Sequence, residues 1–165
     1  MNDQPQILLF QTTDPAAVKK RLLRFRAAFL RLGPQCRFAA ISYTPNARTE
    51  VRKVVLDGVE IEHHVYGPDA IDTLGYPAKG AARPFKLIPG NCDLPPLLFR
   101  RAQPQYTQYW VVEDDVEYSG ELYDLFAGLA GREGDLLAAH LARGEAEWTY
   151  ASMLRAPGIE IRPAD

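Results

Sequence analysis

The sequence has few cysteines and little net charge, and each shortage narrows the class of protein. Only two cysteines, Cys36 and Cys92, occur among 165 residues, too few for a disulfide framework, and they lack the CxxC spacing of a typical metal site. We therefore expect two free thiols in a reducing compartment. The net charge is -2, with both signs mixed along the chain, so we expect no nucleic-acid partner.

Long apolar segments are also missing. No uninterrupted apolar run approaches the roughly 18 residues of a membrane span, and no basic-then-apolar leader opens the sequence. We expect a cytoplasmic protein without a transmembrane segment. With 47% hydrophobic and 24% charged residues, the composition predicts one domain over residues 1–165.

The most informative stretch is an apolar segment that ends in three adjacent carboxylates. Residues 109–112 are aromatic or β-branched, which predicts a strand covered on both faces. Glu113, Asp114 and Asp115 then lie at its carboxyl end, the edge where open α/β sheets bind ligands. Neighbouring carboxylates repel one another unless water or a hard cation such as Mg²⁺ or Mn²⁺ screens them. The pattern is compatible with a metal-phosphate site or with a solvated turn.

The first 45 residues predict a strand, a helix and a second strand. Residues 7–10 and 37–43 are the apolar strand candidates, and Asp14 with Pro15 is a helix start signal. Such a succession favours a right-handed βαβ unit. One helical stripe is formed by Val18, Leu22, Phe25, Phe29 and Leu32. The opposite face, which we interpret as solvated, carries Lys19, Lys20, Arg21, Arg24 and Arg31.

The end of the first strand is a second candidate for ligand contact. Thr12 and Asp14 follow that strand, so they are candidates to bind a nucleotide base or ribose. Capping of the helix also explains Asp14, and the two roles are compatible.

The middle of the sequence has weaker patterns. Residues 51–55 fit a strand or a short helix, Asp57-Gly58 is a turn signal, and residues 59–66 alternate weakly. Within this last segment, His63 and His64 are adjacent, and adjacent strand residues point to opposite faces, so one metal ion rarely takes both. We therefore expect a polar edge strand.

The second half predicts further helices and strands. A short helix over 69–74 is followed by an irregular connection over 76–91, whose basic residues Lys79, Arg83 and Lys86 are either solvated or available to neutralise a phosphate. Asn91 or Asp93 is expected to cap the next helix. Its inner face is predicted to comprise Leu94, Leu97, Leu98 and Ala102. Another helix precedes Gly131, and residues 135–140 predict a further buried strand. These elements indicate an α/β, Rossmann-like fold with a mainly parallel sheet and helices on both faces.

The order of these elements resembles the nucleotide-binding half of GT-A-fold glycosyltransferases. More narrowly, residues 86–140, about a third of the chain, resemble an uncharacterised glycosyltransferase family. The matching motifs are Pro89-Gly90-Asn91-Cys92-Asp93-Leu94-Pro95, Tyr109-Trp110-Val111-Val112-Glu113-Asp114-Asp115 and Asp135-Leu136-Leu137.

The resemblance implies a metal-dependent transfer of sugar from a nucleoside diphosphate sugar to an unknown acceptor. It implies that Asp115 binds Mn²⁺ or Mg²⁺, and that Glu113 and Asp114 contact the ribose, the sugar or metal-bound water. The full expected set of nucleotide-sugar-binding residues is Thr12, Asp14, Lys86, Asn91, Asp93, Glu113 and Asp114.

The sequence departs from this family pattern after His140. Only the 25 residues 141–165 follow, whereas such enzymes usually use a longer part for the acceptor site and the catalytic base. No motif selects a base among His140, Glu145 and Glu147. The alternative function is a non-catalytic α/β domain, derived from a truncated transferase, that binds nucleotide sugars or proteins.

Overall fold

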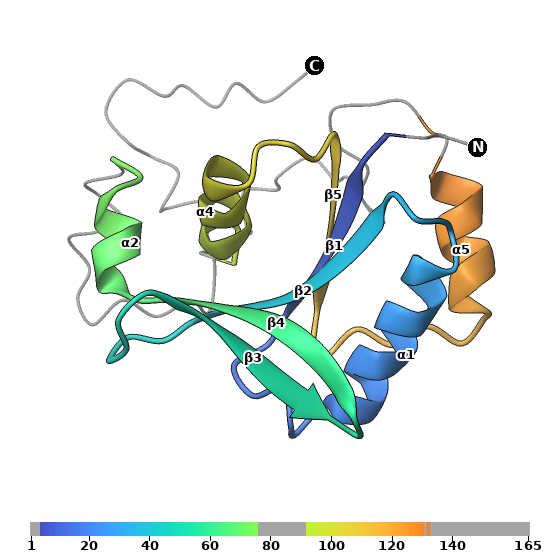
Figure 1. The fold of residues 1–165 in the computed structure, drawn as a ribbon, viewed down its shortest axis with the longest axis horizontal. Coiled ribbons are helices and arrows are strands. Elements are labelled where there is room, and N and C mark those ends of the chain that lie inside the picture. Colours follow the sequence, from blue (N-terminus) through green and yellow to red (C-terminus); the bar gives the residue numbers. More distant parts are fainter. Residues whose placement is uncertain (1–3, 76–91, 131, 133–165) are drawn as a thin grey trace, which may run out of the picture. The chain divides into compact units, whose positions relative to one another are not determined.

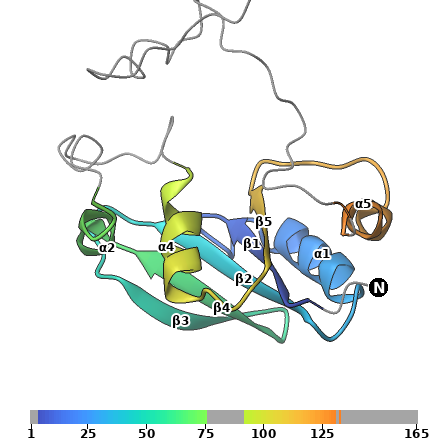
Figure 2. The ribbon, with the colours of Figure 1, turned by 90° about the horizontal axis from the view of Figure 1, so that it is seen from above.

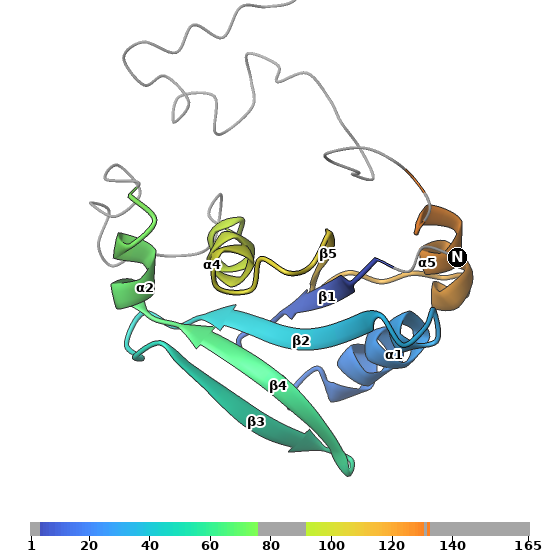
Figure 3. The same ribbon diagram turned by 45° about the horizontal axis from the view of Figure 1, so that its top comes forward.

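The described part of the chain folds into a five-stranded mixed sheet with helices. The computed structural model describes residues 4–75, 92–130 and 132, all of which belong to one compact unit, residues 1–132. The strands lie in the order β3-β4-β2-β1-β5, which can be followed in Figures 1 and 3. β1 pairs in parallel with β2 and β5, β2 pairs in parallel with β4, and β3 and β4 are antiparallel. The α/β class is therefore confirmed. The strands are β1 (Gln6–Gln11), β2 (Cys36–Tyr43), β3 (Glu50–Leu56), β4 (Val59–Tyr66) and β5 (Gln108–Glu113).

Strand β1 has a core on each side of it. Leu8 and Phe10 point to one face, and Ile7 and Leu9 point to the other, because successive strand side chains alternate. All four are at most 2% exposed. A continuous apolar run, as the sequence has here, is the pattern expected of a strand buried on both faces.

Helices α1 (Lys19–Leu30) and α5 (Leu122–Leu129) cover one face of the sheet (Figures 1 and 2). Phe25 and Phe29 of the predicted stripe are buried here. Phe126 of α5 contacts Phe29 and Trp110 edge-on, with ring centroids 5.2 and 5.3 Å apart. Such edge-to-face contacts attach α5 to α1 and to β5.

Helices α2 (Pro68–Asp72) and α4 (Leu94–Ala102) lie on the other face (Figure 1). Leu94, Leu98 and Phe99 of α4 are buried against β1 and β2 residues. The prediction for Ala102 is wrong, because this last residue of the helix is exposed. Among the residues described, no helix has the length and apolar character that crossing a membrane requires.

The hairpin of β3 and β4 forms at the predicted turn. Asp57 and Gly58 have φ values of 48° and 80°. Positive φ at both central residues is what a two-residue type I′ hairpin turn needs, and an Asp-Gly pair adopts it readily. The ambiguous segment at residues 51–55 is therefore a strand.

The prediction that the segment with His63 and His64 is a polar edge strand is wrong. β4 lies between β3 and β2, and both histidines are buried, at 0% and 5% exposure. Their opposite orientation is confirmed, since His63 contacts Ser42 and Arg52, whereas the His64 ring packs on Phe99 of α4. The polar sequence of this segment suggests exposure, but His63 is buried because Ser42 and Arg52, from other strands, supply its hydrogen-bond partners.

The predicted burial of β5 is also wrong. Within the described part of the chain, β5 pairs with β1 alone and therefore lies at the end of the sheet. Val111 is 47% exposed and Trp110 is only partly buried. The predicted strand near Leu136 and the irregular connection at 76–91 lie outside the described residues.

Helix α1 begins later than Pro15, the predicted first helical residue. Residues 15–18 form turns, and the helix starts at Lys19. Asp14 still caps this region, because its Oδ1 accepts hydrogen bonds from the backbone N–H groups of Ala16 and Ala17, at 3.0 and 3.2 Å. The prediction that Asp14 caps the backbone is confirmed, but the helix begins four residues later than predicted.

Candidate functional site

The carboxyl ends of β1 and β5 lie side by side. The parallel register pairs Gln11, the last residue of β1, with Glu113, the last residue of β5. The segments that follow, which contain Thr12 and Asp114, therefore leave the sheet at the same edge. This confirms that the first strand and the acidic stretch share one edge. The recess found nearby lies against α1.

Thr12 and Asp14 shape the loop between β1 and α1. Thr12 is buried, and its backbone N–H donates to the Ile41 carbonyl at 2.9 Å, which continues the ladder beyond the strand. Its Oγ1 accepts a hydrogen bond from the Asp14 backbone N–H at 3.3 Å. The Asp14 carboxylate caps the backbone as described above, so both side chains first serve to hold the loop.

The start of α4 approaches Glu113. The Cys92 thiol hydrogen-bonds with the Glu113 side chain. Partial burial, this hydrogen bond and the negative charges of Glu113 and Asp93 raise the pKa of the thiol. Asp93 occupies the N-cap position of α4, but its side chain makes no capping hydrogen bond. The structure thus brings together two predicted residues, Asp93 and Glu113, and adds Cys92, which the sequence did not single out as a site residue.

The side chains of Asp114 and Asp115 remain available to a ligand. Within residues 4–75, 92–130 and 132, neither side chain has a hydrogen-bond or ion-pair partner. A turn in which the Val116 N–H donates to the Glu113 carbonyl, at 3.2 Å, carries both residues. In the same ranges, no group of three or more His, Cys, Asp or Glu residues is arranged to hold a metal ion.

Arg21 and Arg24 hold the segment that carries these carboxylates. Arg21 donates to the Asp114 carbonyl through Nη1 and to the Glu117 carboxylate through Nε, at 2.9 Å, and Nη2. Arg24 donates through Nη2 to the carbonyls of Tyr118 and Gly120, at 3.1 and 3.2 Å. The face is largely exposed, as predicted for Lys20, Arg24 and Arg31, but two of its arginines also bind a distant segment of the chain. The i, i+3 spacing of the two arginines was the signal available in the sequence, since it places them on one side of the helix.

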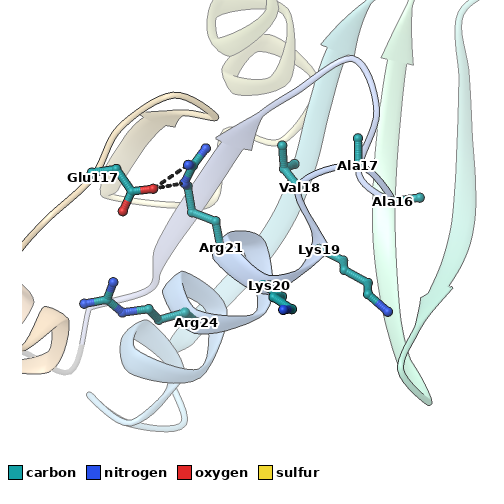
Figure 4. A pocket seen from close by; sticks show the side chains of 8 residues that line it. All are labelled: Ala16, Ala17, Val18, Lys19, Lys20, Arg21, Arg24 and Glu117. Carbon is teal, nitrogen blue, oxygen red and sulfur yellow. Dashed lines mark hydrogen bonds and ion pairs between the residues drawn. The ribbon is translucent and has the colours of Figure 1, made fainter.

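The recess beside α1 is lined by four basic side chains (Figure 4). It has a volume of about 430 Å³, and Lys19, Lys20, Arg21 and Arg24 line it together with Glu117. Two of the four charges are already paired, because Lys19 binds Asp57 at 2.7 Å and Arg21 binds Glu117. Of the four, Lys20 has no polar partner among the described residues. The recess is therefore a poor candidate for a phosphate site.

Two buried polar atoms lie at the same edge of the sheet. The Gln11 Oε1 and Tyr66 hydroxyl oxygen atoms are inaccessible to water and have no hydrogen-bond partner among the described residues. Gln11 ends β1, and Tyr66 ends β4. Unpaired buried polar groups are rare and cost about 1–3 kcal/mol each, so they often mark functional positions. The sequence carries no signal for them, because the missing partner is a property of the fold.

The buried pair of Ser42 and His63 is structural. Arg52 Nε donates to His63 Nδ1 at 3.3 Å, so the neutral imidazole carries its proton on Nε2 and donates it to Ser42 Oγ, 3.0 Å away. In this tautomer His63 cannot accept the proton of Ser42. Burial, the nearby charge of Arg52 and His64 lower the pKa of His63 to about 4, which keeps the ring neutral.

Several predicted residues lie outside the described ranges. These are Lys86 and Asn91 of the nucleotide-sugar set, and the base candidates His140, Glu145 and Glu147. Both cysteines are free thiols, as predicted.

Comparison with known proteins adds no further assignment. No protein-family model, no curated protein and no solved structure matches the chain. A function for this protein must therefore be argued from the chemistry of its own residues.

Proposed function

We propose that this protein is a metal-dependent glycosyltransferase whose Rossmann-like, mainly parallel sheet binds a nucleoside diphosphate sugar. The observation that carries the proposal is that β1 and β5 end at the same position of the sheet, where Gln11 pairs with Glu113. Asp114 and Asp115 follow β5 there, and their side chains have no partner among the described residues. Ligands of open α/β sheets bind at this edge. The alternative of a solvated turn does not account for the unpaired Gln11 and Tyr66 atoms at the same edge.

The carboxylates suit a hard divalent cation whose other ligands are water and, once it is bound, the phosphates of the substrate. Mg²⁺ is usually held by one or two carboxylates, water and substrate phosphates rather than by a cage of protein ligands. Asp115 is the proposed protein ligand for Mg²⁺ or Mn²⁺, and the lack of a larger described cluster agrees with that mode. When bound, the ion would neutralise negative charge that develops on the diphosphate leaving group.

The residues around Asp115 have complementary roles in this proposal. Thr12 and Asp14 border the base and ribose, and Glu113 and Asp114 contact the ribose, the sugar or metal-bound water. Asp93 joins the site from the start of α4. Lys86 and Asn91 complete the proposed nucleotide-sugar site. In the reaction, the bond between the sugar and the diphosphate breaks, the acceptor oxygen bonds to the sugar, and the acceptor proton leaves to a base that we do not assign.

Calorimetry with UDP-, GDP- and CDP-activated sugars tests the proposal. We expect one of them to bind in the presence of Mn²⁺ and chelator to abolish that binding, because the diphosphate and the carboxylates otherwise repel. Equal affinity with and without metal would contradict the role of the acidic edge. Binding without transfer to water or to any acceptor would favour the non-catalytic, nucleotide-sugar-binding alternative. The free thiols are consistent with the cytoplasmic location that we also propose.

A further inference from the structure

The segment that follows β5 is tied to α1 by two arginines from a distant part of the chain. Arg21 contacts the Asp114 carbonyl and the Glu117 carboxylate, and Arg24 contacts the backbone a few residues further on. Figure 4 shows the Arg21 guanidinium directed at Glu117. We name these contacts the arginine clamp, formed by Arg21 and Arg24 on the segment 114–120. The side chains of Asp114 and Asp115 take no part in it.

We propose that the arginine clamp positions Asp114 and Asp115 for the divalent cation. The proposal rests on the proposed function and adds to it two positioning residues. The clamp binds backbone carbonyls and Glu117, so it fixes the path of the segment without occupying the two carboxylates that a cation needs. By pairing with Glu117, Arg21 also prevents a fourth carboxylate from adding its charge to the acidic stretch.

The physical reason is the cost of ordering a short exposed segment. Asp115, Val116 and Glu117 are exposed, and they are held by one turn hydrogen bond and by the clamp. A segment that is already ordered does not have to lose conformational freedom when the cation binds. Loss of groups that orient metal ligands typically lowers metal affinity by about 10–100-fold.

A charge-neutral double replacement separates positioning from simple charge effects. Arg21→Met with Glu117→Gln removes the ion pair of the clamp and leaves the net charge of the protein unchanged. The matched control is Lys19→Met with Asp57→Asn, which removes another exposed ion pair of the same helix and leaves both arginines of the clamp in place. The full chain is titrated with Mn²⁺ alone, monitored by the electron paramagnetic resonance signal of the free ion. Amide hydrogen exchange of residues 114–120 is measured in parallel.

We expect the clamp variant to bind Mn²⁺ about 10–100-fold more weakly and to exchange the 114–120 amides faster, with the control unchanged in both. Arg21→Lys is expected to rescue the affinity only in part, since one ammonium group cannot match the forked contacts of a guanidinium. Unchanged Mn²⁺ affinity in the clamp variant, or an equal loss in the control, would overturn the positioning role. Absence of Mn²⁺ binding by the unsubstituted protein would instead contradict the proposed metal site itself.

Discussion

His63 lies within the sheet with no exposed surface, and burial lowers its pKa to about 4, below the usual value of 6.5. The unfolded chain therefore binds a proton between these pH values that the folded chain does not. The contribution of neutral His63 to the free energy of unfolding is fully present above about pH 6.5, and it is lost as the pH falls toward 4. A difference of this size corresponds to about 3 kcal/mol at most.

We predict that His63→Gln flattens this acid-induced loss of stability. The glutamine amide can still accept from Arg52 and donate to Ser42, but it does not titrate. The free energy of unfolding, measured by denaturant titration between pH 7.5 and 4.5, should fall less in the variant than in the parent protein. Identical slopes in the two proteins would assign the acid sensitivity to other groups.

The two buried atoms without partners allow a second test at single residues. Tyr66→Phe removes a hydroxyl that has no described hydrogen-bond partner, so we expect the free energy of unfolding to stay the same or to rise slightly. Tyr109→Phe is the matched control, because the Tyr109 hydroxyl donates to the Gln103 carbonyl at 2.7 Å. Its loss should cost about 1 kcal/mol. Equal destabilisation by both replacements would mean that the Tyr66 hydroxyl has a partner in solution.

At the level of helices and strands, local patterns identified the elements but not their neighbours. Three features could be predicted because each depends on residues close together in the sequence. They are the helical stripe with Phe25 and Phe29, the Asp57-Gly58 turn and the end of β1. The burial of β4 and the exposure of β5 depend on strand order, which is set by contacts far apart in the sequence. The apolar run of β5 therefore predicted a strand buried within the sheet, although β5 is the last strand of the described sheet.

Helix α5 is predicted to depend on one aromatic side chain for its attachment. Phe126 is 2% exposed and packs against Phe25, Phe29 and Trp110. Phe126→Ala should lower the free energy of unfolding by about 3–5 kcal/mol, since it leaves a cavity in this cluster. Tyr123→Ala, one turn away and only partly buried beneath Arg31, should cost much less. Comparable losses in the two variants, measured by denaturant titration, would show that the cluster does not anchor the helix.

At the scale of the whole molecule, the sequence predicted the edge of the sheet but not how that edge is assembled. The acidic stretch and Thr12 were placed at neighbouring strand ends by the general behaviour of parallel strands, and the register of β1 and β5 agrees. The approach of Cys92 to Glu113 and the contacts of Arg21 with the segment 114–120 join parts of the chain that share no local pattern. Such contacts exist only once the complete fold has formed.

The central claim, that Asp115 holds a cation which recruits the nucleotide, is tested most directly by Asp115→Ala. We predict that this variant loses Mn²⁺-dependent binding of the nucleoside diphosphate sugar, while its thermal melt in chelator stays the same or rises slightly, because crowded carboxylates repel without their cation. Asp124→Ala, which removes an exposed carboxylate from α5, is the control and should bind like the parent protein. Calorimetric titration of the three proteins with Mn²⁺ and nucleotide sugar gives the answer. Parent-like binding by Asp115→Ala, with a marked loss of stability in chelator, would make Asp115 a structural residue and contradict the glycosyltransferase account.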